Sequence, residues 1–470
     1  MPGCEMKLHE KTELFIILPM LLIPVCRVSA DSRGYIVKFN TDISSVFDTS
    51  RFAEIGENKN TYKIDDLNDL GGLNQYIAYC EANDEVDLIE GIEPISLFKL
   101  PDDELYSQQW QTQMINADYA WEFETYGNQV NVAVIDSGCN AHVDLDDNLA
   151  GGYNYTDKSK SNDFSDNVGH GTHVTGIIAA QMNGIGIVGA APKANIYALK
   201  CVDKYVSAGT DILATAIYDA VDKYHCRVIN LSLGIKLDKN VIYDAVKYAY
   251  EKGVIIVAAV GNDGNDTIYY PAGYDEVIGV GSVGIAKEKS YFSQKNESVF
   301  VVAPGEKVKS LKGTDEYILM QGTSQAAPLV TGAAAIMFSV DEDVTPQKFK
   351  ELLKTTSADL GDIGKDNLYG WGLLNVEKLM DSAMGDCYVS PINEGKVVVY
   401  NNTGSIINAE GIWANYSGNK YIGGETEKLL LMPQKKIKLK HMDCTEETKF
   451  FLWQSLNNMK PLTKNRIGGR

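Results

Sequence analysis

Between about residues 101 and 385, short apolar runs rich in β-branched residues alternate with longer stretches of helical periodicity. The apolar runs lie at residues 130–135, 228–233, 254–260 and 277–280, and the helical stretches at 211–224, 241–252 and 325–338. Continuous apolar strands separated by helices are typical of a parallel sheet that is covered by helices on both faces. We therefore expect an α/β fold for this part of the chain.

The segments on either side follow other patterns. Strand-like runs at residues 35–39 and 86–90 flank a polar stretch compatible with helix, which predicts a small α+β unit. Strand-like runs such as 396–400 and 428–432 predict a small β-rich module near the C-terminus. We expect boundaries that give four parts: 1–30, 31–102, 103–385 and 386–470.

The first thirty residues resemble an export signal. Residues 14–26 form an apolar run, and Val28-Ser29-Ala30 fits a small-residue cleavage site before Asp31. The run is short for a membrane-spanning helix, although a retained anchor is the alternative. We expect a signal peptide at 1–30, a secreted mature protein, and no stable membrane insertion after the signal is removed.

Composition excludes several classes of function. The chain has 43 basic and 63 acidic residues, a net charge of −20, which argues against nucleic acid as a partner because backbone binding needs clustered positive charge. Its 8 cysteines are scattered without a CxxC pair, so neither a structural zinc site nor a disulfide-stapled scaffold is expected. A disulfide between Cys387 and Cys444 is possible.

Two residues in the α/β region could form an acid–imidazole pair. Asp136 follows the run at 132–135 and precedes a turn, so it is either a site residue at a strand end or an ordinary turn acid. His170 lies between two glycines, directly before an apolar helical run. Histidine suits a general base near neutral pH, but proximity alone does not distinguish His170 from His173.

A serine and an asparagine complete the group of candidates. Ser324 opens the apolar helix, where its hydroxyl lies near the positive end of the helix dipole; the alternative is a simple N-cap. Asn262 ends another buried strand at a glycine-rich turn, and its alternative is a plain turn residue. Serine becomes a nucleophile when a base takes its proton, and an amide can stabilise the resulting oxyanion.

Four segments carry a family resemblance. VAVIDSG, GHGTHVTG, AAVGNDG and GTSQAAP resemble the signature segments of the subtilisin-like serine proteases, and the similarity runs from about residue 104 to 380. The resemblance implies a subtilisin-like parallel sheet flanked by helices. It implies that Ser324 is the nucleophile, His170 the general base, Asp136 the orienting acid and Asn262 an oxyanion donor, while His173 is structural.

The resemblance also implies residues that bind substrate. Ser232, Leu233 and Gly234 match the strand that pairs with an extended substrate backbone, and Ala259 and Gly261 belong to the opposite wall of the first specificity pocket. Tyr269 aligns near the base of that pocket, where many relatives carry glycine. It either shortens the pocket or adds a hydroxyl there, which argues against a preference for large aromatic P1 side chains, or it swings aside into packing.

A calcium site and an inhibitory prodomain are further expectations from the resemblance. Hard oxygen ligands suit Ca²⁺, and the alternative is a polar loop without metal. The expected ligands are two acids and a loop: Asp103, Asp144, Gln181, Asn183, Ile185 and Ile187. The unit at 31–102 looks like the family's prodomain, an intramolecular inhibitor that is cut off between about residues 98 and 104.

These observations predict a secreted serine endopeptidase that acts on polypeptides and is made as an autoprocessed zymogen. One alternative is a catalytically silent scaffold that binds a partner through the module at 386–470. Another is a processing protease with narrow specificity. The natural substrate does not follow from the sequence.

Overall fold

The computed structural model describes residues 101–470 apart from 205–208, 393–394, 418–419, 432, 434, 442–443, 445–446, 456–459, 464–465 and 468–470, and before residue 101 it describes four strands. The expected signal peptide, its cleavage site and the helix-compatible stretch of the α+β unit lie outside the described residues. The chain forms two compact units, which divide between Phe98 and Lys99.

The first unit contains a four-stranded antiparallel sheet in the order β2-β3-β1-β4. Its strands are β1 (Tyr35–Phe39), β2 (Ala53–Glu54), β3 (Thr61–Ile64) and β4 (Val86–Gly91). The strands expected at 35–39 and 86–90 are therefore present.

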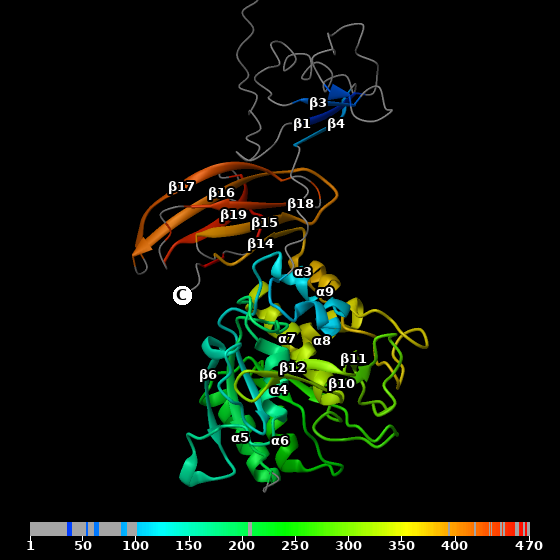
Figure 1. Ribbon diagram of the computed structural model, residues 1–470. Coiled ribbons are helices and arrows are strands. Elements are labelled where there is room, and N and C mark those ends of the chain that lie inside the picture. The colour runs from blue at the N-terminus through cyan, green and yellow to red at the C-terminus, as the bar shows by residue number, and fades with distance from the viewer. Residues whose placement is uncertain are drawn as a thin grey trace, which may run out of the picture. The chain divides into compact units, whose positions relative to one another are not determined.

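The second unit is built on a seven-stranded parallel sheet in the order β11-β10-β9-β8-β5-β7-β6. In Figure 1, β6 is labelled on one side of this body and β10 and β11 on the other. The strands are β5 (Asn131–Asp136), β6 (Leu149–Asn154), β7 (Asn195–Lys200), β8 (Val228–Leu231), β9 (Ile255–Ala259), β10 (Val277–Val283) and β11 (Val301–Pro304). The predicted α/β fold is confirmed.

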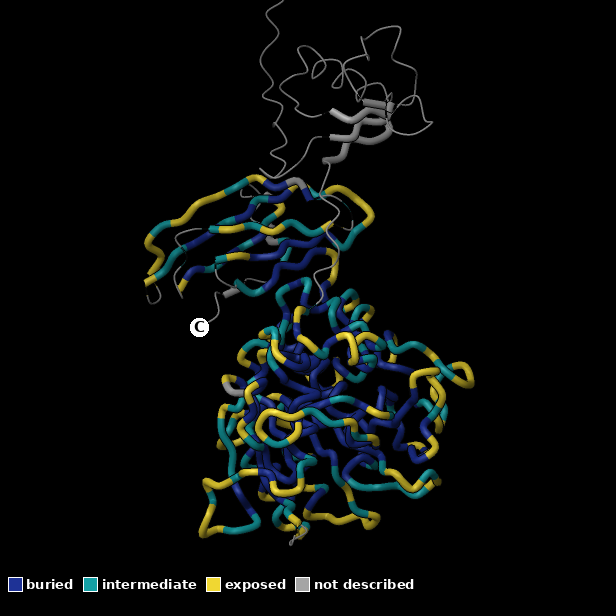
Figure 2. Tube along the Cα trace, in the orientation of Figure 1, coloured by how far each residue is buried: buried dark blue, intermediate teal, exposed yellow. Residues whose placement is uncertain are grey.

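Alternate side chains along the central strand enter two separate cores. Val132 and Val134 of β5 belong to one apolar cluster, and Ala133 and Ile135 belong to the other. The first cluster contains side chains of α4 (His170–Ala179) and α7 (Thr323–Val340), and the second contains those of α5 (Thr210–Asp222) and α6 (Asn240–Glu251). Helices therefore cover both faces, and Figure 2 shows the buried residues concentrated inside this body.

Smaller elements complete the body. An antiparallel hairpin joins β12 (Val308–Lys312) to β13 (Glu316–Met320) and packs against α4. The remaining helices are η3 (Tyr106–Gln108), α2 (Trp110–Met114), α3 (Ala117–Trp121), η4 (Asp146–Asn148), η5 (Lys158–Lys160), α8 (Pro346–Thr356) and α9 (Val376–Met384). Among the described residues, α7 has the length and composition to span a membrane, but all of it is buried within the body, as in the core helix of a globular protein.

The C-terminal part forms two antiparallel sheets, as expected for a β-rich module. One has the order β14-β15-β18 and the other β17-β16-β19-β20, with β21 beside β19. Their strands are β14 (Cys387–Val389), β15 (Lys396–Asn401), β16 (Ile407–Ser417), β17 (Lys420–Leu431), β18 (Lys435–Lys440), β19 (Lys449–Ser455), β20 (Lys460–Pro461) and β21 (Arg466–Ile467).

The three-stranded sheet is covered on both faces. Val397 and Val399 of β15 join a core with the second sheet, whereas Val398 and Tyr400 join the core of the α/β body. Across this contact, the ring of Phe123 lies 5.2 Å from that of Tyr400, measured between centroids. The module therefore packs directly onto the body, and the domain boundary at residue 385 stays a prediction.

The described cysteines are buried or partly buried. Cys387 carries a free thiol, so the possible disulfide with Cys444 is not formed. Cys139, three residues after Asp136, is buried, and burial raises the pKa of its thiol to about 12. A thiol that stays protonated at neutral pH is a packing residue and a poor nucleophile.

We expect Phe123→Ala to lower the free energy of unfolding by about 3–5 kcal/mol, because it leaves a cavity in a fully buried site between the body and the module. Chemical denaturation should show this loss. Tyr291→Ala is the control, since its side chain is 77% exposed and its loss should cost within about 0.5 kcal/mol. A loss below about 1 kcal/mol for Phe123→Ala would contradict the packing described.

Candidate active site

The carboxyl end of β5 and the start of α4 bring an acid and an imidazole together. Asp136 is the last residue of β5 and His170 the first of α4, and Asp136 Oδ1 lies 2.7 Å from His170 Nδ1. Glycine is required beside them, because a Cβ at Gly171 would lie 2.2 Å from the carbonyl oxygen of Gly138. The backbone at Gly171 therefore lies close to that at Gly138, and this close approach brings Asp136 and His170 within hydrogen-bond distance.

The environment of this pair favours a charged imidazole. Asp136 is 4% exposed. Its carboxylate raises the pKa of His170 above the usual 6.5, and burial opposes this shift. A carboxylate on Nδ1 also leaves Nε2 of the neutral ring free to accept a proton. The two residues thus have the arrangement of a general base and its orienting acid.

Asp166, which was not among the residues predicted from the sequence, is hydrogen-bonded to the segments that carry both members of the pair. Its carboxylate accepts hydrogen bonds from the Ser137 hydroxyl at 2.9 Å and from the Thr172 N–H and hydroxyl, each at 2.8 Å. Ser137 adjoins Asp136, and Thr172 lies two residues after His170. The sequence could have indicated this role, because an acid four residues before His170 can accept hydrogen bonds from N–H groups at the start of the helix.

Ser324 lies in the first turn of α7, which begins two residues earlier than expected. Gly322 is the N-cap of this helix, so the N-cap alternative for Ser324 is wrong. The Ser324 hydroxyl donates to the carbonyl oxygen of Ser232 at 3.1 Å, and the Ser232 hydroxyl donates to the Ser324 carbonyl at 2.9 Å. Asn230 extends the buried network by donating from Nδ2 to the Ser232 hydroxyl at 3.0 Å. This reciprocal pairing attaches Ser324 to the segment after β8.

The amide of Asn262 has a defined orientation. Its Oδ1 accepts from the backbone N–H of Thr323 at 2.8 Å and from the Thr323 hydroxyl at 3.0 Å. Because the oxygen is engaged by two donors, the Nδ2 amino group points elsewhere and keeps its N–H groups available. Thr323, which the sequence analysis also missed, thereby positions Asn262.

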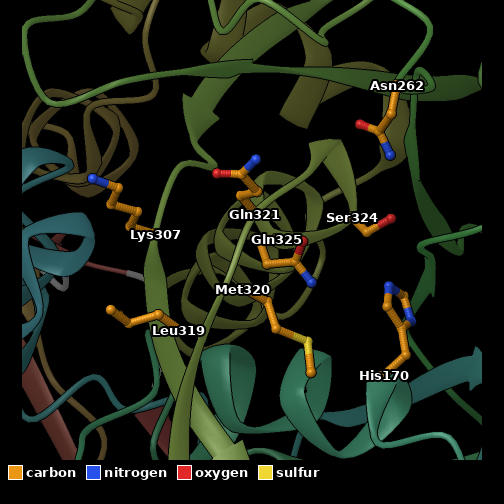
Figure 3. Close-up of a pocket in the computed structure, with 8 residues that line it drawn as sticks. All are labelled: His170, Asn262, Lys307, Leu319, Met320, Gln321, Ser324 and Gln325. Atoms are coloured by element: carbon orange, nitrogen blue, oxygen red, sulfur yellow. The ribbon is translucent and has the colours of Figure 1, made fainter.

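His170, Asn262 and Ser324 line one hollow of about 470 Å³ (Figure 3). In the figure, the imidazole extends from its helix toward Ser324, and Asn262 lies beyond the serine. The remaining lining residues come from the segment before β12, from the end of β13 and the residue after it, and from α7: Lys307, Leu319, Met320, Gln321 and Gln325. A hydroxyl, an oriented imidazole and an amide donor at one hollow can support acyl transfer.

The other histidine candidate has a different environment. His173 is fully buried, and its Nε2 contacts the carbonyl oxygens of Val308 at 3.2 Å and Ile318 at 3.3 Å, one from each strand of the hairpin. Burial lowers the pKa of His173 to about 4. Its neutral ring therefore connects α4 to the hairpin and is not a base for the hollow.

The expected substrate-binding residues flank Ser324 but lie outside the lining of this hollow. Ser232 contacts Ser324 directly, and Leu233 and Gly234 follow it. Ala259 ends β9, and Gly261 precedes Asn262. Tyr269 lies against both glycines of these segments. The two segments lie at the carboxyl ends of the neighbouring parallel strands β8 and β9.

The structure brings Asp103 and Asp144 into contact with the loop expected to bind calcium. Asp103 Oδ1 accepts from the N–H groups of Asn183 and Gly184, and Asp144 Oδ2 accepts from the N–H of Ile187 at 2.9 Å. The other carboxylate oxygens, Asp103 Oδ2 and Asp144 Oδ1, are buried without a hydrogen-bond partner among the described residues. Burial raises the pKa of both acids, that of Asp144 to about 7.

Two buried carboxylate oxygens without a hydrogen-bond partner among the described residues fit a hard cation, which would compensate their charge. The loop contains the other expected ligands, Gln181, Asn183, Ile185 and Ile187. The Asn183 Oδ1 accepts from the Ile185 N–H at 2.9 Å. Among the described residues, no group of three or more His, Cys, Asp or Glu side chains gathers as a metal site. Any cation here would therefore depend on backbone and amide oxygens.

The chain is similar to known proteins over the region that contains these residues. A model of the subtilase family matches residues 127–372. The minor extracellular protease Epr of Bacillus subtilis (strain 168) is 37% identical over 278 residues, which cover 59% of this chain and 42% of that protein. An alkaline protease of Alkalihalobacillus alcalophilus is 33% identical over 370 residues, which cover 71% of this chain and 95% of that protein.

Two further relatives extend the comparison. An intracellular serine protease of Paenibacillus polymyxa is 38% identical over 276 residues, covering 56% of this chain and 83% of that protein. Among solved structures, a protease from Pseudoalteromonas arctica PAMC 21717 has a TM-score of 0.56 and 28% identity, covering 60% of this chain and 99% of that one. The names of the relatives thus include proteases from both inside and outside the cell.

We expect the pKa of His170, measured by NMR, to lie above 6.5 and to fall in Asp136→Asn, because the variant loses the negative charge that stabilises the imidazolium. His173 is the internal control, and its pKa should stay well below 6.5 in both proteins. An unchanged pKa for His170 in the variant would contradict the electrostatic coupling described.

Proposed function

The chain belongs to the subtilase family of serine-type endopeptidases, and we propose that it hydrolyses peptide bonds through a triad of Ser324, His170 and Asp136. The observation that supports this most strongly is the shared hollow, where the imidazole paired with Asp136 faces the serine at the start of α7. Ser324, His170 and Asp136 are far apart in the sequence, and together they have the chemistry of a nucleophile, a base and an orienting acid.

In the first half of the proposed reaction, the Ser324 hydroxyl attacks the carbonyl carbon of the scissile bond. His170 accepts the hydroxyl proton at Nε2 and then donates it to the leaving amine, while Asp136 stays ionised and stabilises the imidazolium. The hydroxyl donates to Ser232 in the structure. It must therefore turn toward His170 before attack. In the second half, water attacks the acyl-enzyme through the same base.

We assign Asn262 and the backbone N–H of Ser324 to stabilisation of the oxyanion. Thr323 occupies the Asn262 oxygen and so directs Nδ2 away from itself. The first turn of α7 adds N–H groups without intrahelical partners and the positive end of the helix dipole. Such preorganised donors act where negative charge develops, and losing one costs about 10²–10³ in kcat in subtilisin.

We assign Ser232, Leu233 and Gly234 to pairing with the substrate backbone, and Ala259 and Gly261 to the facing wall. The segments follow adjacent parallel strands, so both can reach a peptide whose carbonyl carbon lies at Ser324. The substrates are polypeptides. The module at 386–470 is assigned an accessory role.

A structural calcium ion is part of the proposal. Asp103, Asp144 and the loop at 181–187 would hold it, since two buried carboxylate oxygens there lack partners among the described residues. When bound, the ion would neutralise these carboxylates and hold the loop against the segment near Asp103. It takes no part in the peptide-bond chemistry.

The proposed enzyme is secreted and made as a zymogen. The apolar run at 14–26 supports export. The β-sheet unit before residue 98 supports an inhibitory prodomain at 31–102, which would be cut off by the enzyme itself between about residues 98 and 104. A parallel sheet with distant strand contacts forms slowly, which gives a folding template a physical purpose.

We expect Ser324→Ala to lower kcat for peptide hydrolysis by at least about 10⁴, because the nucleophile is lost. Release of the prodomain should stop as well, which gel electrophoresis would show. Ser339→Ala, near the other end of α7, should keep both activities. Hydrolysis and self-cleavage that persist in Ser324→Ala would refute the assignment, whereas inactivity of the correctly folded wild-type protein would favour a silent scaffold.

We expect a calcium chelator to lower the melting temperature of the wild-type protein, because the buried carboxylates of Asp103 and Asp144 lose their counter-charge. In Asp144→Asn, the melting temperature should no longer depend on calcium. Asp211→Asn, at an exposed position of α5, should retain the full dependence. If the wild type has the same melting temperature with calcium and with chelator, the proposal of a structural calcium ion is wrong.

A further inference from the structure

The space beside Ser324 that would receive a substrate side chain has two walls. The segment after β8 contacts Ser324 through Ser232, and the segment after β9 contains Asn262. If a peptide carbonyl carbon lies at Ser324 and its oxygen at Asn262, the side chain of that residue, P1, enters between the two segments. This step rests on the proposed function.

The ring of Tyr269 already occupies this space. A Cβ added to Gly261 would lie 2.7 Å from Cδ2 and 3.0 Å from Cε2 of Tyr269. A Cβ added to Gly234 would lie 3.5 Å from Tyr269 Cβ and 3.6 Å from its Cδ1. The Tyr269 side chain therefore lies beside a glycine of each wall, at van der Waals distance from a Cβ added to Gly234 and closer than that to one added to Gly261. A large P1 side chain could otherwise pack against Gly234 and Gly261, but the Tyr269 side chain covers both glycines.

Tyr269 and its neighbour Tyr270 make polar contacts with the segments of both walls. Tyr270 pairs with Ile235 through two backbone hydrogen bonds of 2.8 Å. The Tyr269 hydroxyl donates to Asp263 Oδ2 at 2.8 Å, and the same oxygen lies 2.9 Å from the Lys236 ammonium. Lys236 follows the first wall and Asp263 follows the second, so this polar cluster connects the two walls around the tyrosine.

We propose that Tyr269 determines specificity by closing the first pocket to large side chains, so that the enzyme cleaves after residues with small side chains such as glycine, alanine or serine. The ring contributes the restriction through its volume. The hydroxyl contributes by anchoring the ring to Asp263. Of the two interpretations of Tyr269 left open by the sequence, the contacts with Gly234 and Gly261 favour the shortened pocket.

The test compares two peptide p-nitroanilides that differ only in P1, alanine or phenylalanine. For the wild-type enzyme we expect kcat/KM to be at least about tenfold higher for alanine. Tyr269→Gly should raise the ratio of kcat/KM for the phenylalanine substrate to that for the alanine substrate at least about tenfold. Tyr269→Phe keeps the ring and should keep the preference for alanine, which separates volume from the hydroxyl.

Two outcomes would overturn the inference. One is a wild-type enzyme that prefers phenylalanine, and the other is a preference that Tyr269→Gly leaves unchanged. If Tyr269→Gly does not fold, as judged by circular dichroism, Tyr269→Ala provides the same comparison with a smaller opening. Failure of the proposed function gives a different result, because the folded wild-type enzyme would then hydrolyse neither substrate nor any other peptide.

Discussion

The arrangement of the active site depends on the burial of helix α7. All of its residues are buried, and it contacts α4 and the strands β8, β9, β10 and β11. The first turn of such a helix cannot shift without disturbing the core, so Ser324 has a fixed place relative to His170 at the start of α4. A buried chain of polar contacts reinforces this, since Thr331 of α7 donates to Asn230, whose amide reaches Ser232. Dense packing thereby holds reactive groups that the chain itself brings from distant positions.

Much of this site could be predicted from the sequence because each reactive residue lies at a strand end or a helix start. The runs of β-branched residues predicted β5, β8, β9 and β10. Because these strands are parallel, Asp136 and Asn262 lie on the same side of the sheet, where the strands have their carboxyl ends. The predicted runs did not include β6, β7 or β11. In β6, Gly151 and Gly152 interrupt the apolar pattern, and the pairing with β7 establishes the strand.

The features that sequence reasoning missed are those that depend on contacts between distant segments. Asp166 looks like a loop acid until its hydrogen bonds to Ser137 and Thr172 are known. The two covered faces of the C-terminal three-stranded sheet also require tertiary information, since alternation predicts two faces but not what covers them. The position of Tyr269 is of the same kind. Its neighbours in the fold, Gly234 and Gly261, lie in the segments after β8 and β9, and they decide between a filled pocket and a displaced ring.

The central claim is that His170 activates Ser324 as a nucleophile within one hollow. Labelling with a fluorophosphonate, followed by mass spectrometry of the modified peptide, tests it most directly because the reagent reacts with an activated serine. The account predicts one modified residue, Ser324, in the wild-type protein and a loss of labelling in folded His170→Ala. Modification of a different residue, or equal labelling of Ser324 without the imidazole, would contradict it.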